Sequence, residues 1–596
     1  MHLKPEDLAI GKENFHAAIG SNVPGPGGSA SQREFLLARI QDGLAVGGIP
    51  GHAYFGYDAT MDEPVRIGVL GTGDQGSVQI GAINPAFVQV KAIADLRPYN
   101  QFRAFHGDMY SDAAAQVRPG LMKKYDWKTE DEARKNVKVY DSYQELIANA
   151  KEDGIEAVII GLPLHLHAPA AIAAMKAGLH VLTEKLMGHS VRECKEMSRA
   201  AKQLGKHLAT GHQRHYNILY SSAVDLIRRG VLGELHYIRA QWHRGNLPGN
   251  DSWRQPMPRG AKPKDDLAGR LEAELVSWER QLAAAEKDKK APEMAAWAKK
   301  VAQKKAQIAD EILAEAVTKY GYVDRSVLDA NGKVVYEAPA IEELIRWRLW
   351  DRTGGGLMAE LGSHQLDAAS IFVAAAHDGE KQYPLSVAAA SNRSLFPPDR
   401  DVDDHVFCLF EYPAADYDAA DPLKELNRVG VQYASINGNG YGGYGETVLG
   451  TEGTLQLMTE KEAMLWRTAA TSEKTRVVYG RRAEKPVLQL SADGDPESAA
   501  IGQMAMKDAD RGYQQQIEHW AWCIRKNPDA TDPDVQPRCH PKVAMGDAVI
   551  ALTSNKAAQE GLRVEFKKEW FDPESDALPE NDLLGLDVKP DLSRYE

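Results

Sequence analysis

Residues 65–76 read Val65-Arg66-Ile67-Gly68-Val69-Leu70-Gly71-Thr72-Gly73-Asp74-Gln75-Gly76, a short, mostly apolar run that enters a glycine-rich turn. The run is rich in β-branched side chains, which is typical of a buried strand. In the G-x-G-x-x-G turn, Gly71 permits a tight bend and Gly73 lets the backbone approach a pyrophosphate, while Gly76 lets the next helix pack close to the strand. The stretch therefore predicts a dinucleotide-binding unit, with a bare structural turn as the alternative.

An acidic residue stands where such a unit needs one. A second apolar run, residues 88–94, ends at Asp95. A carboxylate about 20 residues after the glycines accepts both ribose hydroxyls of NAD and repels the 2′-phosphate of NADP. NAD is therefore the expected cofactor, although Arg97 keeps NADP as an alternative. The residues expected to bind it here are Gly71, Thr72, Gly73, Asp74, Gln75, Gly76, Asp95 and Arg97.

The alternation of apolar strands and helices continues to about residue 213. Further strands are expected at 156–161, 180–183 and 206–211, with helices between them. This order predicts a doubly wound parallel sheet, in which ligands bind beyond the carboxyl ends of the strands. The polar residues that follow these ends are His165, His167, Glu184, Lys185 and His212.

The composition sets limits on the function. Of 596 residues, 43% are apolar and 26% charged, as in soluble globular proteins, and the length allows three to five domains or two large ones with insertions. The net charge of −13 argues against a nucleic-acid partner. The four cysteines show no CxxC pair, and no apolar run reaches 18 residues, so we expect neither a disulfide framework nor a membrane span.

The N-terminal residues 1–64 are expected to form an irregular arm. The segment Ser31-Gln32-Arg33-Glu34-Phe35-Leu36 resembles a decayed twin-arginine export signal, in which one arginine remains. Arg39 and Asp42 interrupt the apolar region that an export signal needs. We therefore expect a retained arm and a cytoplasmic protein, with the periplasm as the alternative.

The second part of the chain, residues 214–565, contains an insertion at about 262–320. Leu267, Leu271, Leu275, Trp278 and Leu282 recur at helical spacing, and a second amphipathic pattern follows the break at 287–292. The two patterns predict an antiparallel helical hairpin that acts as a lid or an oligomer contact. Sheet is expected at 402–412, 430–436 and 446–457, and helices at 513–526 and 541–560. A C-terminal tail is expected at 566–596, with a polar surface segment at 572–596.

Several motifs together resemble the glucose–fructose oxidoreductase/inositol dehydrogenase/MocA family over most of residues 65–565. The motifs are the glycine-rich turn, Asp95, Pro163 to His167, Glu184-Lys185, Arg214, residues 230–234, 354–367 and 448–455. The resemblance implies an α/β protein with an N-terminal Rossmann domain and a C-terminal α/β domain with a large, mostly antiparallel sheet. It also implies an active site between them that oxidises or reduces a sugar or cyclitol hydroxyl.

The resemblance also assigns site residues. The family's Glu-Lys-Pro motif matches Glu184-Lys185-Leu186, with leucine in place of proline, and its Asp-x-x-x-His motif matches Glu360 and His364. Pro163, His167, Glu184, Lys185 and Arg214 join the expected cofactor-binding residues.

The residues themselves support the same chemistry. On a helix, Glu360, His364 and Asp367 share one face, just after three consecutive glycines. Alcohol oxidation needs a base for the hydroxyl proton, which suits histidine, and a desolvated lysine can hold or relay that proton. We expect His364 as principal acid or base, Lys185 as relay and Glu360 as the orienting group. The first two roles are exchangeable, and the alternative is a surface lysine with a structural histidine.

Substrate contacts are expected from aromatic and arginine side chains, which suit a polyol ring and its hydroxyls. The candidates are Trp242, Arg244, Trp253, Arg254 and Asp367, with Trp347-Arg348, Tyr441 and Tyr444 as further possibilities. For the tryptophans, core packing is the alternative. The His165/His167 pair lacks matched ligands at zinc spacing, so no metal is expected.

The sequence therefore predicts an NAD-dependent oxidoreductase that acts on a secondary hydroxyl of a sugar, cyclitol or glycoside, as a homo-oligomer (dimer or tetramer). One alternative keeps NAD bound through a redox-neutral cycle, in which transient oxidation of a ring carbon permits glycoside hydrolysis, elimination or epimerisation. Another is a non-catalytic sensor of NAD or sugar.

Overall fold

The computed structural model describes residues 55–460, 462–467, 474–482, 485–492 and 511–596. Most of the expected N-terminal arm, including the export-like segment, lies outside these ranges. Among the described helices, none combines the length and apolarity that a membrane crossing requires.

The first domain is built on a six-stranded parallel sheet with the order β3-β2-β1-β4-β5-β6. Its strands are β1 (Val65–Leu70), β2 (Val88–Ala94), β3 (Lys138–Tyr140), β4 (Ala157–Ile160), β5 (His180–Thr183) and β6 (Leu208–Thr210). The principal helices between them are α4 (Asp74–Ala82), α5 (Pro98–His106), α10 (His167–Lys176) and α11 (Val191–Leu204). The strand order reverses between β1 and β4, where ligands bind in open α/β sheets. The predicted Rossmann topology is confirmed.

The chain returns to this first sheet near its end. Helix α19 (Tyr513–Lys526) contributes Ile517 and Trp520 to the core cluster that holds Val65 and Ile67 of β1. Residues far beyond the predicted boundary at 213 therefore help to build the cofactor domain, and the exact domain boundaries stay a prediction.

The second domain is built on a mixed, mostly antiparallel sheet of ten strands with the order β17-β16-β15-β14-β13-β7-β12-β11-β10-β18. Only β7 and β12 run parallel within it. The strands are β7 (Leu235–Arg244), β10 (Ser386–Asn392), β11 (His405–Pro413), β12 (Arg428–Asn437), β13 (Tyr444–Gly450), β14 (Gly453–Met458), β15 (Glu462–Arg467), β16 (Lys474–Arg482), β17 (Lys485–Ala492) and β18 (Arg563–Glu565). The predicted α/β fold class is therefore confirmed.

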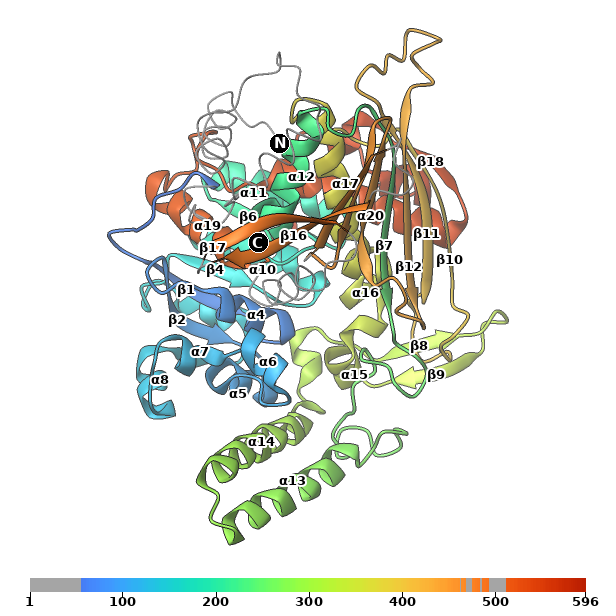
Figure 1. Ribbon diagram of the computed structural model, residues 1–596. Coiled ribbons are helices and arrows are strands. Elements are labelled where there is room, and N and C mark those ends of the chain that lie inside the picture. The colour runs from blue at the N-terminus through green and yellow to red at the C-terminus, as the bar shows by residue number, and fades with distance from the viewer. Residues whose placement is uncertain (1–54, 461, 468–473, 483–484, 493–510) are drawn as a thin grey trace.

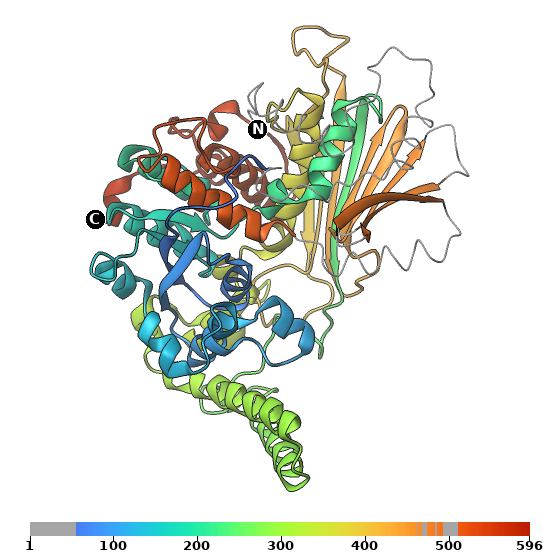
Figure 2. The same cartoon turned by 60° about the vertical axis from the view of Figure 1, so that its left-hand side comes forward.

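One face of this sheet is covered by helices α12 (Ile218–Arg228), α17 (Ser363–Ala376) and α20 (Pro541–Glu560) (Figure 2). The strands alternate buried and exposed residues, because successive side chains point to opposite faces. On the open face, Phe407 and Leu409 are 42% and 50% exposed. The predicted homo-oligomer stays a prediction.

The predicted hairpin insertion is present as α13 (Arg270–Lys287) and α14 (Ala291–Ala309), which project from the body (Figure 1). The rings of Trp278 and Trp297 meet between the two helices with centroids 6.5 Å apart. Near its base, α14 packs against α5 of the Rossmann domain. The insertion therefore reaches the cofactor domain, although it lies in the sequence of the second domain.

The C-terminal tail packs on the body, and the prediction of a surface segment at 572–596 is wrong for its first part. Trp570, Phe571 and Leu578 are buried in the main core cluster, and the ammonium group of Lys195 on α11 donates hydrogen bonds to three carbonyl groups of this segment. The composition of the segment is polar on average, but it contains a few large apolar side chains that pack into the core.

Trp570→Ala should lower the free energy of unfolding by about 3–5 kcal/mol, because it removes a buried indole and leaves a cavity. Leu586→Ala is the matched control in the same segment, since Leu586 is 47% exposed and should change stability by less than about 0.5 kcal/mol. Chemical denaturation measures both. Equal stability of the two variants would show that the segment is not part of the folded core.

Candidate active site

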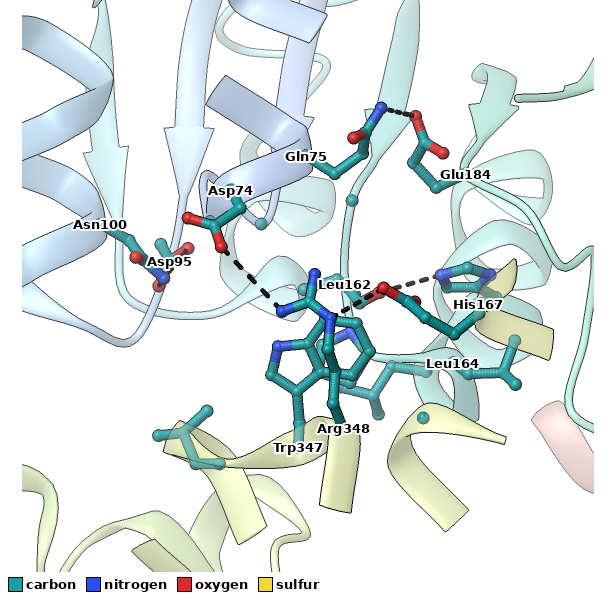
Figure 3. A pocket seen from close by; sticks show the side chains of 18 of the residues that line it. Asp74, Gln75, Asp95, Asn100, Leu162, Leu164, His167, Glu184, Trp347 and Arg348 are labelled. Atoms are coloured by element: carbon teal, nitrogen blue, oxygen red, sulfur yellow. Dashed lines mark hydrogen bonds and ion pairs between the residues drawn. The ribbon is translucent and has the colours of Figure 1, made fainter. Parts of the chain in front are cut away.

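A cavity of about 340 Å³ lies between the carboxyl edge of the parallel sheet and the start of α17 (Figure 3). The predicted residues that line it are Gly71, Gly73, Asp74, Gln75, Asp95, Arg97, Pro163, His167, Glu184, Lys185, Trp242, Arg244, Glu360 and His364. They come from both domains and from positions up to 293 residues apart (71 to 364), so the fold brings most of the predicted site together.

The glycine-rich turn leaves room for a close ligand. Gly71 has φ of +83°, and a Cβ on it would lie 2.6 Å from the carbonyl oxygen of Gly161. A Cβ on Gly76 would lie 2.0 Å from the carbonyl oxygen of Gly71. Gly76 and the buried Thr72 therefore shape the turn without lining the cavity, whereas Gly73 caps α4 at the cavity wall. A helix N-terminus in this position favours phosphate.

The Asp95 carboxylate at the end of β2 is held from three sides. It accepts hydrogen bonds from the backbone N–H groups of Thr72 (2.7 Å) and Arg97 (2.9 Å), and from Nδ2 of Asn100 (3.2 Å). These contacts fix its orientation at the cavity wall, where the sequence predicts a contact with the ribose of NAD.

Arg97 forms an ion pair with a residue of the insertion. Its Nε lies 2.8 Å from Oδ2 of Asp310, which directly follows α14 and is fully buried. The other carboxylate oxygen of Asp310 accepts a hydrogen bond from the backbone N–H of Tyr99 (3.1 Å). No motif pointed to Asp310, because the contact depends on how the insertion folds back onto α5.

Glu184 and Lys185 follow β5 and point in different directions. Glu184 accepts hydrogen bonds from Gln75 (3.0 Å) and Gln79, and burial raises the pKa of its carboxyl group. The ammonium group of Lys185 donates to the carbonyl oxygens of Ala359 (3.2 Å) and Glu360. Burial lowers the pKa of Lys185, against the opposing effect of Glu360. The peptide bond between Lys185 and Leu186 is cis.

Glu360 lies in a π-helical turn, Met358–Gly362, that leads into α17. Such turns occur often at functional sites. Oε1 of Glu360 accepts a hydrogen bond from Arg348 (2.8 Å), and Oε2 lies 3.8 Å from Nζ of Lys185. Burial would raise the pKa of Glu360, but Arg348, Lys185 and Arg244 outweigh it and lower the pKa to about 2. The carboxylate is therefore ionised.

His364 lies one turn further along the chain and is 8% exposed. Its ring centroid is 5.5 Å from that of Trp242 and 6.2 Å from that of His212, and its Nδ1 is buried without a hydrogen-bond partner. Burial, together with the positive charges of Lys185 and Arg214, lowers the pKa of His364 well below its ordinary value. The ring is therefore neutral at neutral pH and able to accept a proton.

Asp367 does not join the cavity, contrary to the substrate contact expected from helical periodicity. Its carboxylate is 1% exposed and bonds to Nε2 of His215 at 2.8 Å. Glu360 and His364 line the cavity, whereas Asp367 lies almost one turn further along α17, inside the core. Helical periodicity predicts which residues share a face but not how far along that face a cavity extends.

Three other predicted contacts also lie outside the cavity lining. Arg214 is buried between Glu446 (2.8 Å) and Glu460 (3.0 Å) and donates to the carbonyl oxygen of His364 (2.8 Å), so it supports α17 rather than the cofactor. Trp253 is buried in the core, the alternative foreseen for it. Arg254 is drawn into ion pairs with acidic neighbours. Of the further possibilities, Tyr444 stacks on Trp242 at 4.3 Å, and Tyr441 is 87% exposed.

Trp347 and Arg348, which the sequence offered as further possibilities, also line the cavity. They lie opposite the glycine turn, and Arg348 approaches Asp74 (4.0 Å) (Figure 3). Sequence reasoning missed other lining residues, which include Tyr320 and Tyr322 where the insertion ends and Arg511 and Tyr513 at the start of α19. The repeated Trp-Arg pair was the signal for Trp347 and Arg348, whereas tertiary folding alone brings the others here.

The predicted absence of a metal stays a prediction. Two groups of possible metal ligands are relevant to it. The ring nitrogens of His167 lie 2.7 and 2.9 Å from the carbonyl oxygens of Leu186 and Leu162, so the His165/His167 pair does not face a common ion. A buried set of His212, Cys539 and Asp547 brings possible ligand atoms within 4.8 Å of one another. Nζ of Lys381 lies 2.5 Å from Oδ1 of Asp547 and supplies a cation there.

Comparison with known proteins matches residues 65–212 to the family model "Oxidoreductase family, NAD-binding Rossmann fold". A curated relative, the "Uncharacterized oxidoreductase YdgJ" of Escherichia coli (strain K12), is 31% identical over 120 residues, which are 20% of this chain and 35% of the relative. A "Glycosyl hydrolase family 109 protein" of Solibacter usitatus is 24% identical over 237 residues, 38% of this chain and 50% of the relative. The matches thus span about a third to a half of these relatives.

Among solved structures, an inositol dehydrogenase homolog from Azotobacter vinelandii, complexed with NAD+, superposes with a TM-score of 0.51 at 13% identity. The superposition covers 87% of this chain and all (100%) of that one. At this identity it supports the two-domain fold alone. Together with the family match, it confirms the predicted Rossmann domain.

The His364 ring should titrate well below the ordinary histidine pKa of about 6.5, because burial and the nearby positive charges disfavour its protonated form. Nuclear magnetic resonance of histidine-labelled protein measures this, with His364→Ala to assign the signal. Lys185→Met should move the titration to higher pH, because a positive charge that disfavours protonation is lost. Titration at pH 6.5 or above in the unaltered protein would contradict the buried, cation-flanked position.

Proposed function

We propose that this protein is an NAD-dependent oxidoreductase acting on a secondary hydroxyl of a sugar, cyclitol or glycoside. The premise is that its residues 65–212 are a Gfo/Idh/MocA-family NAD-binding Rossmann domain. One observation carries the proposal. Lys185 from the Rossmann domain and Glu360 and His364 from the second domain line the same cavity as the glycine-rich turn.

The residues present fit a dinucleotide. Near Gly73 the nearest atom to an added Cβ is Nδ2 of Asn100 at 3.6 Å, so the turn is open on the side where a pyrophosphate would lie. Asp95 would hold the adenosine ribose, and Lys185 and Glu184 would lie toward the nicotinamide end. When bound, the nicotinamide supplies the hydride acceptor or donor.

The chain's own residues handle the proton. Neutral His364 takes the proton of the substrate hydroxyl, and the Lys185 ammonium holds the hydroxyl oxygen and relays the proton. Ionised Glu360 orients Lys185 from 3.8 Å and is itself held by Arg348. The roles of His364 and Lys185 are exchangeable, because burial lowers the pKa of both groups.

Lys185→Met and His364→Ala should each lower kcat by about 10²–10⁴-fold, the usual contribution of a positioned acid or base. Turnover is measured by NADH absorbance on a substrate found by screening neutral sugars, cyclitols, uronates and glycosides. NADH binding, followed by fluorescence, shows that the variants are folded, and Lys333→Met removes an exposed lysine as control. Full turnover in both active-site variants would overturn the assignment.

The preference for NAD over NADP has its own structural support. Asp95 presents a negative charge where NADP carries its 2′-phosphate. Arg97 is the cation that would compensate for that charge, and the insertion supplies Asp310 to neutralise it. The insertion thereby acts on cofactor choice.

Asp310→Asn should tighten NADP+ binding by about tenfold and leave NAD+ binding within about twofold, because Arg97 loses its charged partner while the side chain keeps its shape. Isothermal titration calorimetry measures both dissociation constants. The double variant Arg97→Met/Asp310→Asn is the control and should lose the gain. An unchanged affinity for NADP+ in Asp310→Asn would remove Asp310 from cofactor choice.

A redox-neutral reaction is the second candidate, because several curated relatives are named glycosyl hydrolase family 109 proteins, at 24% to 28% identity. Tyr320 and Tyr322, where the insertion ends, line the cavity and would help to retain a cofactor through a full cycle. Product formation from glycosides without added NAD would support this reaction, whereas NADH released in proportion to product supports net oxidation.

A further inference from the structure

Six cationic side chains line the cavity, and five of them have a carboxylate within 4 Å. The pairs are Arg97–Asp310 (2.8 Å), Arg103–Asp74 (2.7 Å), Arg348–Glu360 (2.8 Å), Arg511–Glu460 (2.8 Å) and Lys185–Glu360 (3.8 Å). The sixth is Arg244. Within the described part of the chain, its guanidinium group has neither an ion pair nor a hydrogen bond, and its Nε is buried without a partner.

Arg244 lies at the reacting end of the cavity. It is the last residue of β7, two residues after Trp242, so both side chains point to the same face of the sheet. The centre of its guanidinium group is 5.7 Å from the Trp242 ring, which stacks on Tyr444 and lies 5.5 Å from the His364 ring. Burial lowers the pKa of Arg244, with Glu360 opposing.

A largely buried guanidinium without a partner is costly, because the charge has lost water and gained no counter-charge. The cost is recovered if an anion arrives with the ligand. The phosphates of a dinucleotide are expected at the N-terminus of α4, where the glycine turn and the helix dipole receive them. The anion beside Trp242 and His364 is then part of the substrate.

We infer that Arg244 is a carboxylate subsite and that the substrate is a sugar acid, such as a uronate or its glycoside. This inference rests on the proposed function and narrows its substrate class. The planar guanidinium fork matches a carboxylate with two parallel hydrogen bonds. The indole face of Trp242 beside it suits the apolar face of the sugar ring.

The charge favours a carboxylate over a phosphate. Each of the other five lining cations has a carboxylate of the protein within 4 Å, with Glu360 shared by Arg348 and Lys185. A carboxylate matches the single charge of the Arg244 guanidinium and its two parallel hydrogen bonds, whereas a phosphate monoester carries up to two negative charges near neutral pH.

The test compares each acid with its neutral parent. Binding of glucuronate, galacturonate and mannuronate, and of glucose, galactose and mannose, is measured by calorimetry on the full chain saturated with NADH. At least one acid should bind ten or more times more tightly than its parent. Arg244→Met should bring that ratio to within about twofold, and Arg244→Lys should restore part of it. Arg239→Met, on the same strand but exposed, should leave it unchanged.

The inference is overturned if none of the acids binds, or if every acid binds less than about twofold more tightly than its neutral parent. It is also overturned if the ratio survives in Arg244→Met, or if glucose 6-phosphate binds more tightly than every uronate. Separate titration of the protein with NADH distinguishes failure of the proposed function from failure of the carboxylate subsite. Failure to bind NADH contradicts the proposed function, whereas NADH binding without preference for an acid contradicts only the carboxylate subsite.

Discussion

The ammonium group of Lys185 connects the two domains at the point where the chemistry is expected. It extends from the carboxyl end of β5 and donates hydrogen bonds to two carbonyl oxygens of the π-helical turn before α17. Buried polar groups must be paired, so this contact holds the second domain against the edge of the parallel sheet. The cavity, the nearness of Glu360 to Lys185 and the entry of α17 beside the glycine turn all depend on that closure.

One electrostatic field has opposite effects on the two groups that face Lys185. Arg348, Lys185 and Arg244 keep Glu360 ionised although it is buried. Positive neighbours also add to burial in keeping His364 neutral. An excess of positive charge around the cavity thus keeps one buried side chain anionic and a neighbouring imidazole neutral. The same excess leaves Arg244 unpaired.

Local pattern predicted much of the fold, and the limits are physical. Apolar strands such as 65–70 and 88–94, and helices such as 513–526 and 541–560, were predicted with their observed bounds because burial sets their periodicity. The family resemblance pointed to Lys185 and His364, which line the cavity. The sequence misplaced Asp367, because periodicity does not give the depth of a residue along α17, and Arg214, because two glutamates distant in sequence surround it. Asp310 and Arg511 were missed, since only tertiary folding brings them to the cavity.

The hairpin insertion has one end in the cofactor domain and the other in solvent. Its base contacts α5 and holds Arg97 through Asp310, while its far turn at residues 288–290 is exposed. Thermodynamic reciprocity then applies along its length. If a molecule bound at the tip changes the affinity of the cavity for its ligand, that ligand must change the affinity of the tip for the molecule by the same factor. The hairpin thus connects a solvent-exposed turn with the wall of the cavity.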